Sequence, residues 1–241
     1  MSEENKRPQS KLYALATRDI KINLSPQTKK KLIILAVTVC ALFAVSFLRY
    51  RIYINLRGNL STRILNIIYR IVETGITISA MRISGMEIKP VFRFRGARQY
   101  VFGVISGLVI LFIIAVVPTF FGTSLIGHHA ETAIGDYIFC FFNYFFLVAP
   151  VEELIYRVFV QDTLTDILPK AKWLGVVAAA GIFGLAHIIA GTWYQVRITA
   201  ILGLVWGFMR YFSKDRAFFS TVVSHGLYDF GLILALQFVI K

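Results

Sequence analysis

Seven apolar segments, each about long enough to cross a bilayer, constrain the fold of this chain more than any other feature. Their approximate ranges are 32–48, 64–81, 100–117, 137–164, 174–189, 196–212 and 218–239. Hydrophobic residues make up 57% of the 241 residues, whereas a soluble domain contains roughly 45–50% apolar residues. The sequence therefore predicts an all-α fold, a polytopic bundle of six or seven transmembrane helices.

The segment 64–81 is the ambiguous one, because it contains Arg70 and Glu73. The two residues are three positions apart, so on a helix they can neutralise each other on one face. The segment can span the membrane, or it can lie in the interface as an amphipathic helix. We favour the spanning arrangement.

The net charge of +13 would suggest nucleic-acid binding in a soluble protein. Here much of the excess lies before residue 100, beside apolar segments, so contact with the bilayer explains it and we expect no nucleic-acid partner. The positive-inside rule puts the N-terminus in the cytoplasm. The four arginines within 49–63 disagree with this rule, since seven spans put them outside.

We divide the chain into three parts: a basic cytoplasmic tail (1–31), one or two N-terminal membrane helices with a basic loop (32–99), and a transmembrane core (100–239). The pair His128-His129 falls in an expected outer loop, where we interpret it as solvated. The two cysteines lie in apolar segments and have neither disulfide-type nor zinc-type spacing.

Three ionisable motifs lie in the apolar core, where charged side chains are costly and often functional. The first contains Glu152, Glu153 and Arg157. Glu153 and Arg157 have the i,i+4 spacing of a helical ion pair, which predicts a structural Glu153. Adjacent helical residues point about 100° apart, so Glu152 faces elsewhere and is free to act as a base.

The second motif runs from Phe183 to His187, which share one helix face, and Gly184 between them permits close approach of a neighbouring helix. The third pairs His225 with Asp229 one turn later, where the acid can orient the imidazole. Each motif alone is equally consistent with a buried structural residue. Three of them on three apolar helices favour a catalytic site.

The order EExxxR, FxxxH and HxxxD resembles the signature of the CPBP family, the CAAX prenyl endopeptidases and bacteriocin-processing proteases also called the Abi family. The resemblance implies a glutamic intramembrane endopeptidase. It implies that Glu152 and His187 activate water and that His225 and residue 229 stabilise the oxyanion. Glu153, Arg157 and Phe183 would support the architecture, and no metal or other cofactor would be needed.

The chain departs from this family at two positions. Val158 follows the motif arginine where the family often has glycine, and Asp229 replaces the asparagine of the CAAX endopeptidases. An ionised Asp229 cannot donate a hydrogen bond to an oxyanion. It can act only when protonated, or by orienting His225.

Three other functions compete with a glutamic protease. Glu152, His187, His225 and Asp229 are also chemically suitable zinc ligands, although the chain has no HExxH motif. A non-catalytic scaffold that binds a sensor or peptide is a second alternative, and a proton-coupled transporter a third. We expect an integral protein of a prokaryotic plasma membrane whose partner is a membrane-associated peptide or protein substrate.

Overall fold

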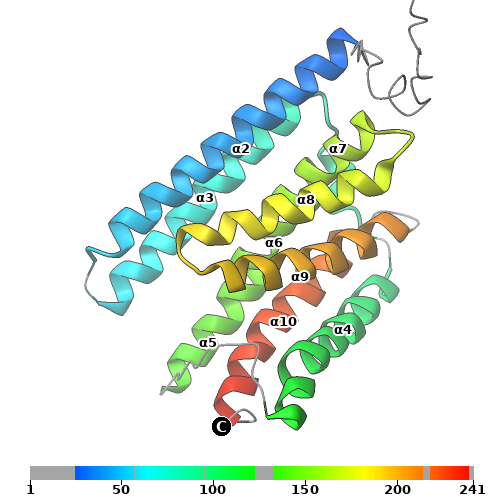
Figure 1. Ribbon diagram of the computed structural model, residues 1–241. Coiled ribbons are helices and arrows are strands. Elements are labelled where there is room, and N and C mark those ends of the chain that lie inside the picture. Colours follow the sequence, from blue (N-terminus) through cyan, green and yellow to red (C-terminus); the bar gives the residue numbers. More distant parts are fainter. Residues whose placement is uncertain (1–24, 57, 95, 123–132, 214–217, 239–241) are drawn as a thin grey trace, which may run out of the picture.

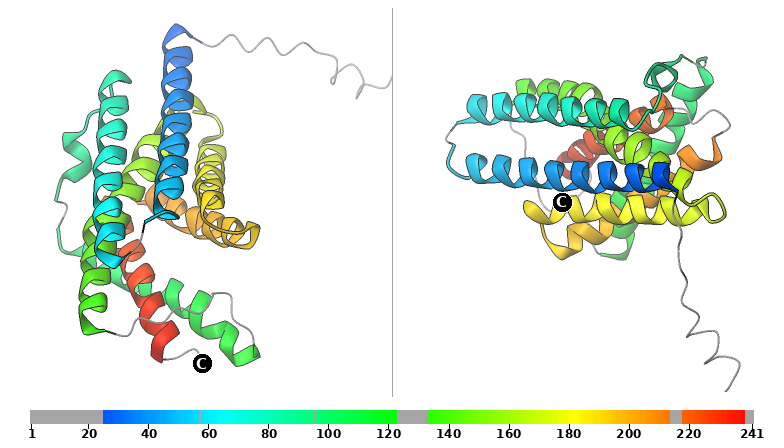
Figure 2. Two further views of the ribbon diagram at one scale, coloured as in Figure 1. Left: turned by 90° about the vertical axis from the view of Figure 1, so that its left-hand side faces the viewer. Right: turned by 90° about the horizontal axis from the view of Figure 1, so that it is seen from above.

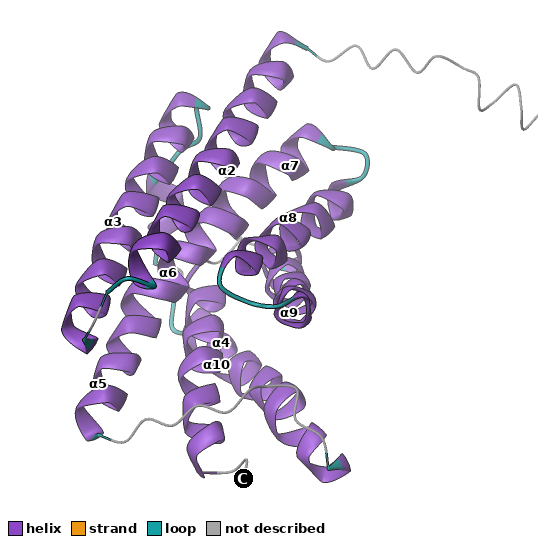
Figure 3. Cartoon of the chain, turned by 60° about the vertical axis from the view of Figure 1, so that its left-hand side comes forward, coloured by secondary structure: helices purple, strands orange, loops and turns teal. Residues whose placement is uncertain are grey.

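The computed structural model describes residues 25–56, 58–94, 96–122, 133–213 and 218–238, and within these ranges the chain is helical with no strand (Figure 3). This confirms the predicted all-α fold. The regular helices are α2 (Pro26–Tyr53), α3 (Asn59–Ile83), α4 (Arg98–Leu111), α5 (Ile134–Asn143), α6 (Ala149–Glu152), α7 (Asp162–Ile167), α8 (Lys172–Ala186), α9 (Trp193–Phe212) and α10 (Phe218–Phe238). The pair His128-His129 lies outside the described residues.

Six stretches of the described chain are long and apolar enough to cross a membrane, so the protein is an integral membrane protein. They are Pro26–Tyr53, Leu60–Ile83, Arg98–Phe121, Ile134–Ile167, Lys172–Ile189 and Phe218–Gln237. The ambiguous segment 64–81 is inside one of them. The predicted span at 196–212 forms a helix, α9, but is not among the six, because Arg197, Arg210 and Gln195 lower its hydropathy.

The first helix begins six residues before the apolar run that predicts it. Ser25 caps the helix by accepting a hydrogen bond from the Thr28 backbone N–H at 3.1 Å, and Pro26 follows at the first helical position. Both are favoured there. The polar residues Lys29–Lys31 therefore form the first turns of α2 instead of ending a tail.

Helices α2 and α3 form an antiparallel hairpin along one side of the bundle, and α8 and α9 form a second hairpin (Figures 1 and 2). Helix α10 packs along α4. Glycines make the last contact possible: a Cβ on Gly103 or Gly107 would come within 2.8 Å of a backbone oxygen of α10. Gly184 plays the same role between α8 and α9, as predicted, since its Cβ would lie 2.7 Å from Val196 O.

The run from Ile134 to Ile167 crosses the bundle but is not one regular helix. It contains two π-helical stretches, η4 (Tyr144–Val148) and η5 (Glu153–Gln161), on either side of α6. Pro150 lies in α6 and cannot donate a backbone hydrogen bond. Every residue of η5 is buried, against α3, α8, α9 and α10. π-helical turns occur frequently at functional sites, and here they carry the first motif.

Four shorter elements complete the fold. A 3₁₀ turn, η1 (Lys89–Phe92), interrupts the basic loop before α4. After α4 the helix continues through a π-helical η2 (Phe112–Val116) and a 3₁₀ turn η3 (Val117–Phe121). A 3₁₀ turn, η6 (His187–Ile189), ends α8 at the second motif.

Candidate active site

Four residues predicted to be catalytic line one cavity of about 900 Å³ between the first-motif helix, the end of α8, α9 and α10. They are Glu152, His187, His225 and Asp229. Residues separated by up to 77 positions in the sequence thus meet at one surface. The size is within the range of about 300–1,000 Å³ typical of ligand pockets.

Glu152 lies in α6, lines the cavity and is hydrogen-bonded to a residue of α3. Its Oε1 accepts a hydrogen bond from Arg70 Nη2 at 2.7 Å, and its Oε2 lies 3.8 Å from His225 Nε2. This ion pair between Arg70 and Glu152 was not predicted from the sequence. The two glutamates contact different residues, as predicted: Glu152 contacts Arg70 and Glu153 contacts Arg157. Because Arg70 binds Oε1 of Glu152, the other oxygen, Oε2, is the one nearer to His225.

Glu153 is sealed inside the protein and faces the third motif. Its Oε1 accepts a hydrogen bond from His225 Nδ1 at 2.9 Å, and its Oε2 is 3.4 Å from Arg157 Nε. The predicted i,i+4 pair of Glu153 and Arg157 is therefore confirmed. The contact between Glu153 and His225, across 72 positions, was not predicted.

Arg157 is 1% exposed, and none of its guanidinium nitrogens has a hydrogen-bond partner among the described residues. Its charge is compensated by Glu153 and by two aromatic faces, with the guanidinium carbon 4.5 Å from the Phe183 ring centre and 5.7 Å from that of Trp206. A cation over an aromatic face is attracted electrostatically, more strongly when it is desolvated. Arg157 thus ties the first motif to the second.

His187 lies where α8 passes into η6, with its ring edge-on to Phe183 at 4.9 Å between centres. The predicted shared face of Phe183 and His187 is confirmed. His187 Nδ1 donates to the Phe183 carbonyl at 2.9 Å, since a carbonyl can only accept. This bond fixes the tautomer and leaves Nε2 with a lone pair.

His225 is fixed from three sides. Its Nδ1 donates to Glu153, its Nε2 lies 3.4 Å from Asp229 Oδ2, and its ring stacks on Trp206 with the ring centres 4.0 Å apart. Trp206 in turn donates from Nε1 to Ser224 Oγ at 3.1 Å. The predicted proximity of His225 and Asp229 is confirmed, but Glu153 makes the shorter contact.

Sequence reasoning missed Arg70 and Glu73 of α3 as members of this site. Arg70 Nη1 donates to Glu73 Oε2 at 2.9 Å, which confirms the predicted pair, while Nη2 of the same guanidinium holds Glu152. The available signal was the presence of Arg70 and Glu73 in an apolar segment, where charged side chains are costly and often functional.

Among the described residues, no group of three or more His, Cys, Asp or Glu side chains is arranged to hold a metal ion. The four residues considered as zinc ligands line the same cavity, but the His225 nitrogens face Glu153 through Nδ1 and Asp229 through Nε2. The described geometry therefore gives His225 partners other than a metal.

A family model described as type II CAAX prenyl endopeptidase, Rce1-like, matches residues 134–231. The match begins with α5, ends within α10 and includes all three motifs. No curated protein and no solved structure matches the chain. The matched segment is therefore similar to the Rce1-like family of type II CAAX prenyl endopeptidases, in agreement with the resemblance of its motifs.

Proposed function

We propose that this protein is an intramembrane endopeptidase that uses Glu152 and His187 to activate the attacking water. The observation that carries the proposal is the shared cavity of Glu152, His187, His225 and Asp229 within the family segment. All four side chains come from helices long and apolar enough to cross a membrane or from their ends. The reaction is hydrolysis of a peptide bond in a membrane-associated peptide or protein.

Water in this mechanism is bound between the Glu152 carboxylate and His187 Nε2. Glu152 accepts one proton from the water as the oxygen attacks the scissile carbonyl carbon, and the carbonyl π bond becomes an oxyanion. The tetrahedral intermediate then collapses, the C–N bond breaks, and the proton passes from Glu152 to the departing amine. A positioned general base of this kind contributes roughly 10²–10⁴-fold to rate.

His225 is the group best placed to stabilise the oxyanion. Its Nδ1 bond to Glu153 directs Nε2 towards the cavity, where Glu152 and Asp229 also lie. In its imidazolium form, in which Nδ1–H still donates to Glu153, His225 also has an Nε2–H that can donate to the developing negative charge. A preorganised donor in a site with little water is especially effective. Asp229 then acts as a positioning residue that orients this N–H, or it donates while protonated.

Arg70 is a positioning residue in this proposal, because it touches Glu152 and not the reacting atoms. By occupying Oε1 it fixes the carboxylate plane and leaves Oε2 for the water. Glu73 holds the other arm of the same guanidinium. The base is therefore oriented by a helix outside the matched family segment.

The alternative is a non-catalytic scaffold, and one comparison separates the two. Membrane proteomes of cells that express the wild type or Glu152→Gln are compared for peptide termini, with Glu87→Gln as control because Glu87 is exposed outside the site. We expect new termini with the wild type and Glu87→Gln, and none with Glu152→Gln at equal protein level. Identical termini from all three would refute the glutamic mechanism.

We further propose that the N-terminus is cytoplasmic and that the protein lies in a plasma membrane. The basic residues at the start of α2, Lys29, Lys30 and Lys31, support this orientation through the positive-inside rule. A reporter that is active only in the cytoplasm, fused to residue 1, tests it. If a reporter that is active only outside the cytoplasm were active at the same position, the N-terminus would lie outside and the proposed orientation would be wrong.

A further inference from the structure

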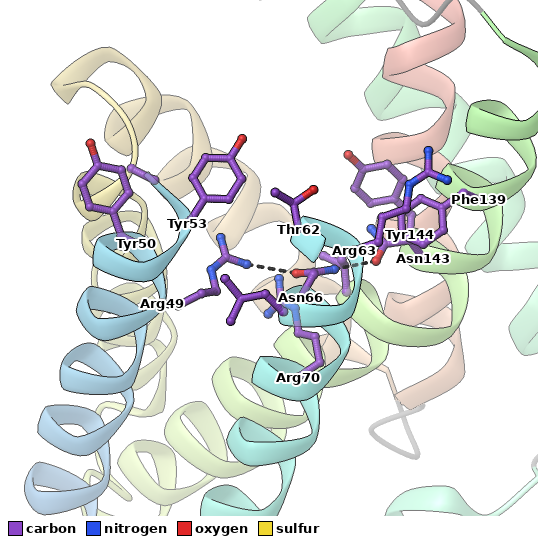
Figure 4. A pocket seen from close by; sticks show the side chains of 13 residues that line it. Arg49, Tyr50, Tyr53, Thr62, Arg63, Asn66, Arg70, Phe139, Asn143 and Tyr144 are labelled. Carbon is purple, nitrogen blue, oxygen red and sulfur yellow. Dashed lines mark hydrogen bonds between the residues drawn. The ribbon is translucent and has the colours of Figure 1, made fainter. Parts of the chain in front are cut away.

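A second cavity, of about 560 Å³, lies between the α2–α3 hairpin and α5, with Arg70 in its lining (Figure 4). Ala190 lines both this cavity and the catalytic one. Its lining includes three arginines, Arg49, Arg63 and Arg70, and no aspartate or glutamate among the described residues. The remaining polar lining consists of tyrosine, threonine and asparagine side chains. Such a lining favours a negatively charged ligand.

Two of the arginines are already balanced by acids outside the lining. Arg63 pairs with Asp136 and lies over the Phe139 ring, and Arg70 pairs with Glu73 and Glu152. Arg49 differs, because its partners are neutral: Nη1 donates to Asn66 Oδ1 at 3.0 Å and the guanidinium lies 4.5 Å from the Tyr69 ring centre. No carboxylate is within ion-pair distance of Arg49 among the described residues.

The position of the cavity indicates a membrane surface. It opens where α2 ends at Tyr53, where α3 begins at Asn59, and beside the first turns of α5. Tyr50 and Tyr53 lie at its rim in Figure 4, and tyrosine is enriched at the membrane–water interface. Around this end of the hairpin the large side chains Phe47, Leu48, Ile52, Leu60 and Ile64 are exposed on the bundle.

We propose that this cavity binds the headgroup phosphate of an anionic phospholipid. Arg49 and Arg63 would hold the phosphate oxygens, which guanidinium groups bind with good geometry. The acyl chains would lie on the exposed apolar side chains next to the cavity. A zwitterionic headgroup is disfavoured, because its ammonium would enter a site lined by cations.

This site also accounts for two of the four arginines in 49–63 that conflict with the positive-inside rule. Arg49 and Arg63 line the cavity, where Arg49 donates to Asn66 and Arg63 pairs with Asp136. Their positions are therefore explained by contacts within the folded protein. The inference does not depend on the proposed protease function, and its test does not use activity.

The test uses the full chain, purified in detergent and depleted of lipid, and titrated with phosphatidylglycerol or phosphatidylcholine in mixed micelles. Native mass spectrometry counts bound lipid, and thermal unfolding reports its effect on stability. We expect one tightly bound phosphatidylglycerol in the wild type. We expect about tenfold weaker binding in Arg49→Gln, since a charge-assisted hydrogen bond is lost.

Arg51→Gln is the matched control, because Arg51 is exposed two positions away and does not line the cavity. It should bind phosphatidylglycerol as the wild type does. Arg49→Lys, which keeps the charge, should restore part of the binding. If Arg49→Gln does not fold, Arg49→Met takes its place as the variant without the charge.

Three results would overturn the proposal. The first is equal phosphatidylglycerol binding in the wild type and in a folded variant without a charge at position 49. The second is equal binding of phosphatidylcholine. The third is displacement of the lipid by millimolar inorganic phosphate or by a short peptide with a free C-terminal carboxylate, which would make the site one for free phosphate or for a peptide end.

Discussion

The matched segment 134–231 and the α2–α3 hairpin both bring charge into the middle of the bundle, but they complete different halves of one site. Within the segment, Glu153 has its own partners, His225 and Arg157, and is sealed from water. Glu152 depends on the hairpin, since Arg70 of α3 is its hydrogen-bonded cation. The buried half is thus internal to the matched segment, and the half that lines the cavity is oriented from outside it.

This difference predicts that the two arginines have different functions. Arg157 is enclosed by Phe183, Trp206 and Glu153, so water cannot replace its contacts. Arg70 lines the polar cavity of the hairpin, where water can reach a substituted side chain. We therefore expect changes at Arg157 to affect folding and changes at Arg70 to affect catalysis.

The largest expected effect is that of Arg157→Ala on stability. Removing one partner of a buried ion pair leaves an unpaired charge, which costs about 3–5 kcal/mol in soluble proteins. Thermal unfolding of the purified protein in detergent should show a strongly lowered midpoint, and membrane accumulation should fall. Arg51→Ala, an exposed arginine, is the control and should change neither. Normal stability with lost cleavage would instead make Arg157 a substrate-binding residue.

The second effect is a loss of catalysis in Arg70→Gln. Without the guanidinium the Glu152 carboxylate can rotate, and misplacement of a catalytic group by about 1 Å can lower the rate roughly 100-fold. We expect the loss in kcat more than in KM, because the binding surface of the cavity is unchanged. The thermal midpoint should fall less than in Arg157→Ala.

Arg70→Lys separates positioning from structure, since it keeps a cation beside Glu152 and should recover part of kcat. Arg82→Gln serves as a matched change at an exposed arginine of the same helix and should cleave normally. If Arg70→Gln unfolded as readily as Arg157→Ala, the proposed difference between a catalytic role for Arg70 and a structural role for Arg157 would be wrong.

Contacts within one helix could be predicted from the sequence, because helical periodicity fixes which residues share a face. The pairs Glu153–Arg157, Phe183–His187, His225–Asp229 and Arg70–Glu73 were all found this way, and each is close in the structure. The all-α bundle and six of the seven predicted spans follow from apolar length in the same manner.

Contacts between helices could not be predicted. No periodicity relates Arg70 to Glu152 or Glu153 to His225, since their geometry depends on how α3, η5 and α10 pack. The π-helical turns around Pro150 also change the side-chain directions that a regular helix predicts. For this reason the partner of Glu152 was not predicted, while its different direction from Glu153 was.

A third and smaller effect concerns Asp229, which belongs to the matched segment and lines the same cavity as Glu152. Asp229→Asn keeps the shape and can donate to an oxyanion through its amide, so substantial activity should remain. Asp229→Ala should lose about tenfold or more, as expected for a lost charge-assisted contact. Kinetic assays of both variants, with and without a chelator, check this.

A zinc mechanism predicts a different pattern for the same variants. Asparagine binds zinc poorly, so both substitutions would fail, and chelation would inactivate the wild type. Stoichiometric zinc in the pure protein, lost together with activity in Asp229→Asn, would replace the glutamic mechanism with a metalloprotease.

The smallest effect is expected for Trp206→Phe, which tests whether the segment holds His225 by packing as well as by Glu153. Phenylalanine keeps a ring that can stack on His225 but removes the Nε1–H that donates to Ser224, a fully buried hydroxyl. The expected cost is about 0.5–1.5 kcal/mol of stability, the net value of one hydrogen bond, with only a small change in kcat. Ser224→Ala removes the other partner, so the double variant should cost little more than either single variant. If Trp206→Phe instead lowered kcat about 100-fold at unchanged stability, Trp206 would contact the substrate, and the buried half of the site would extend to the reacting atoms.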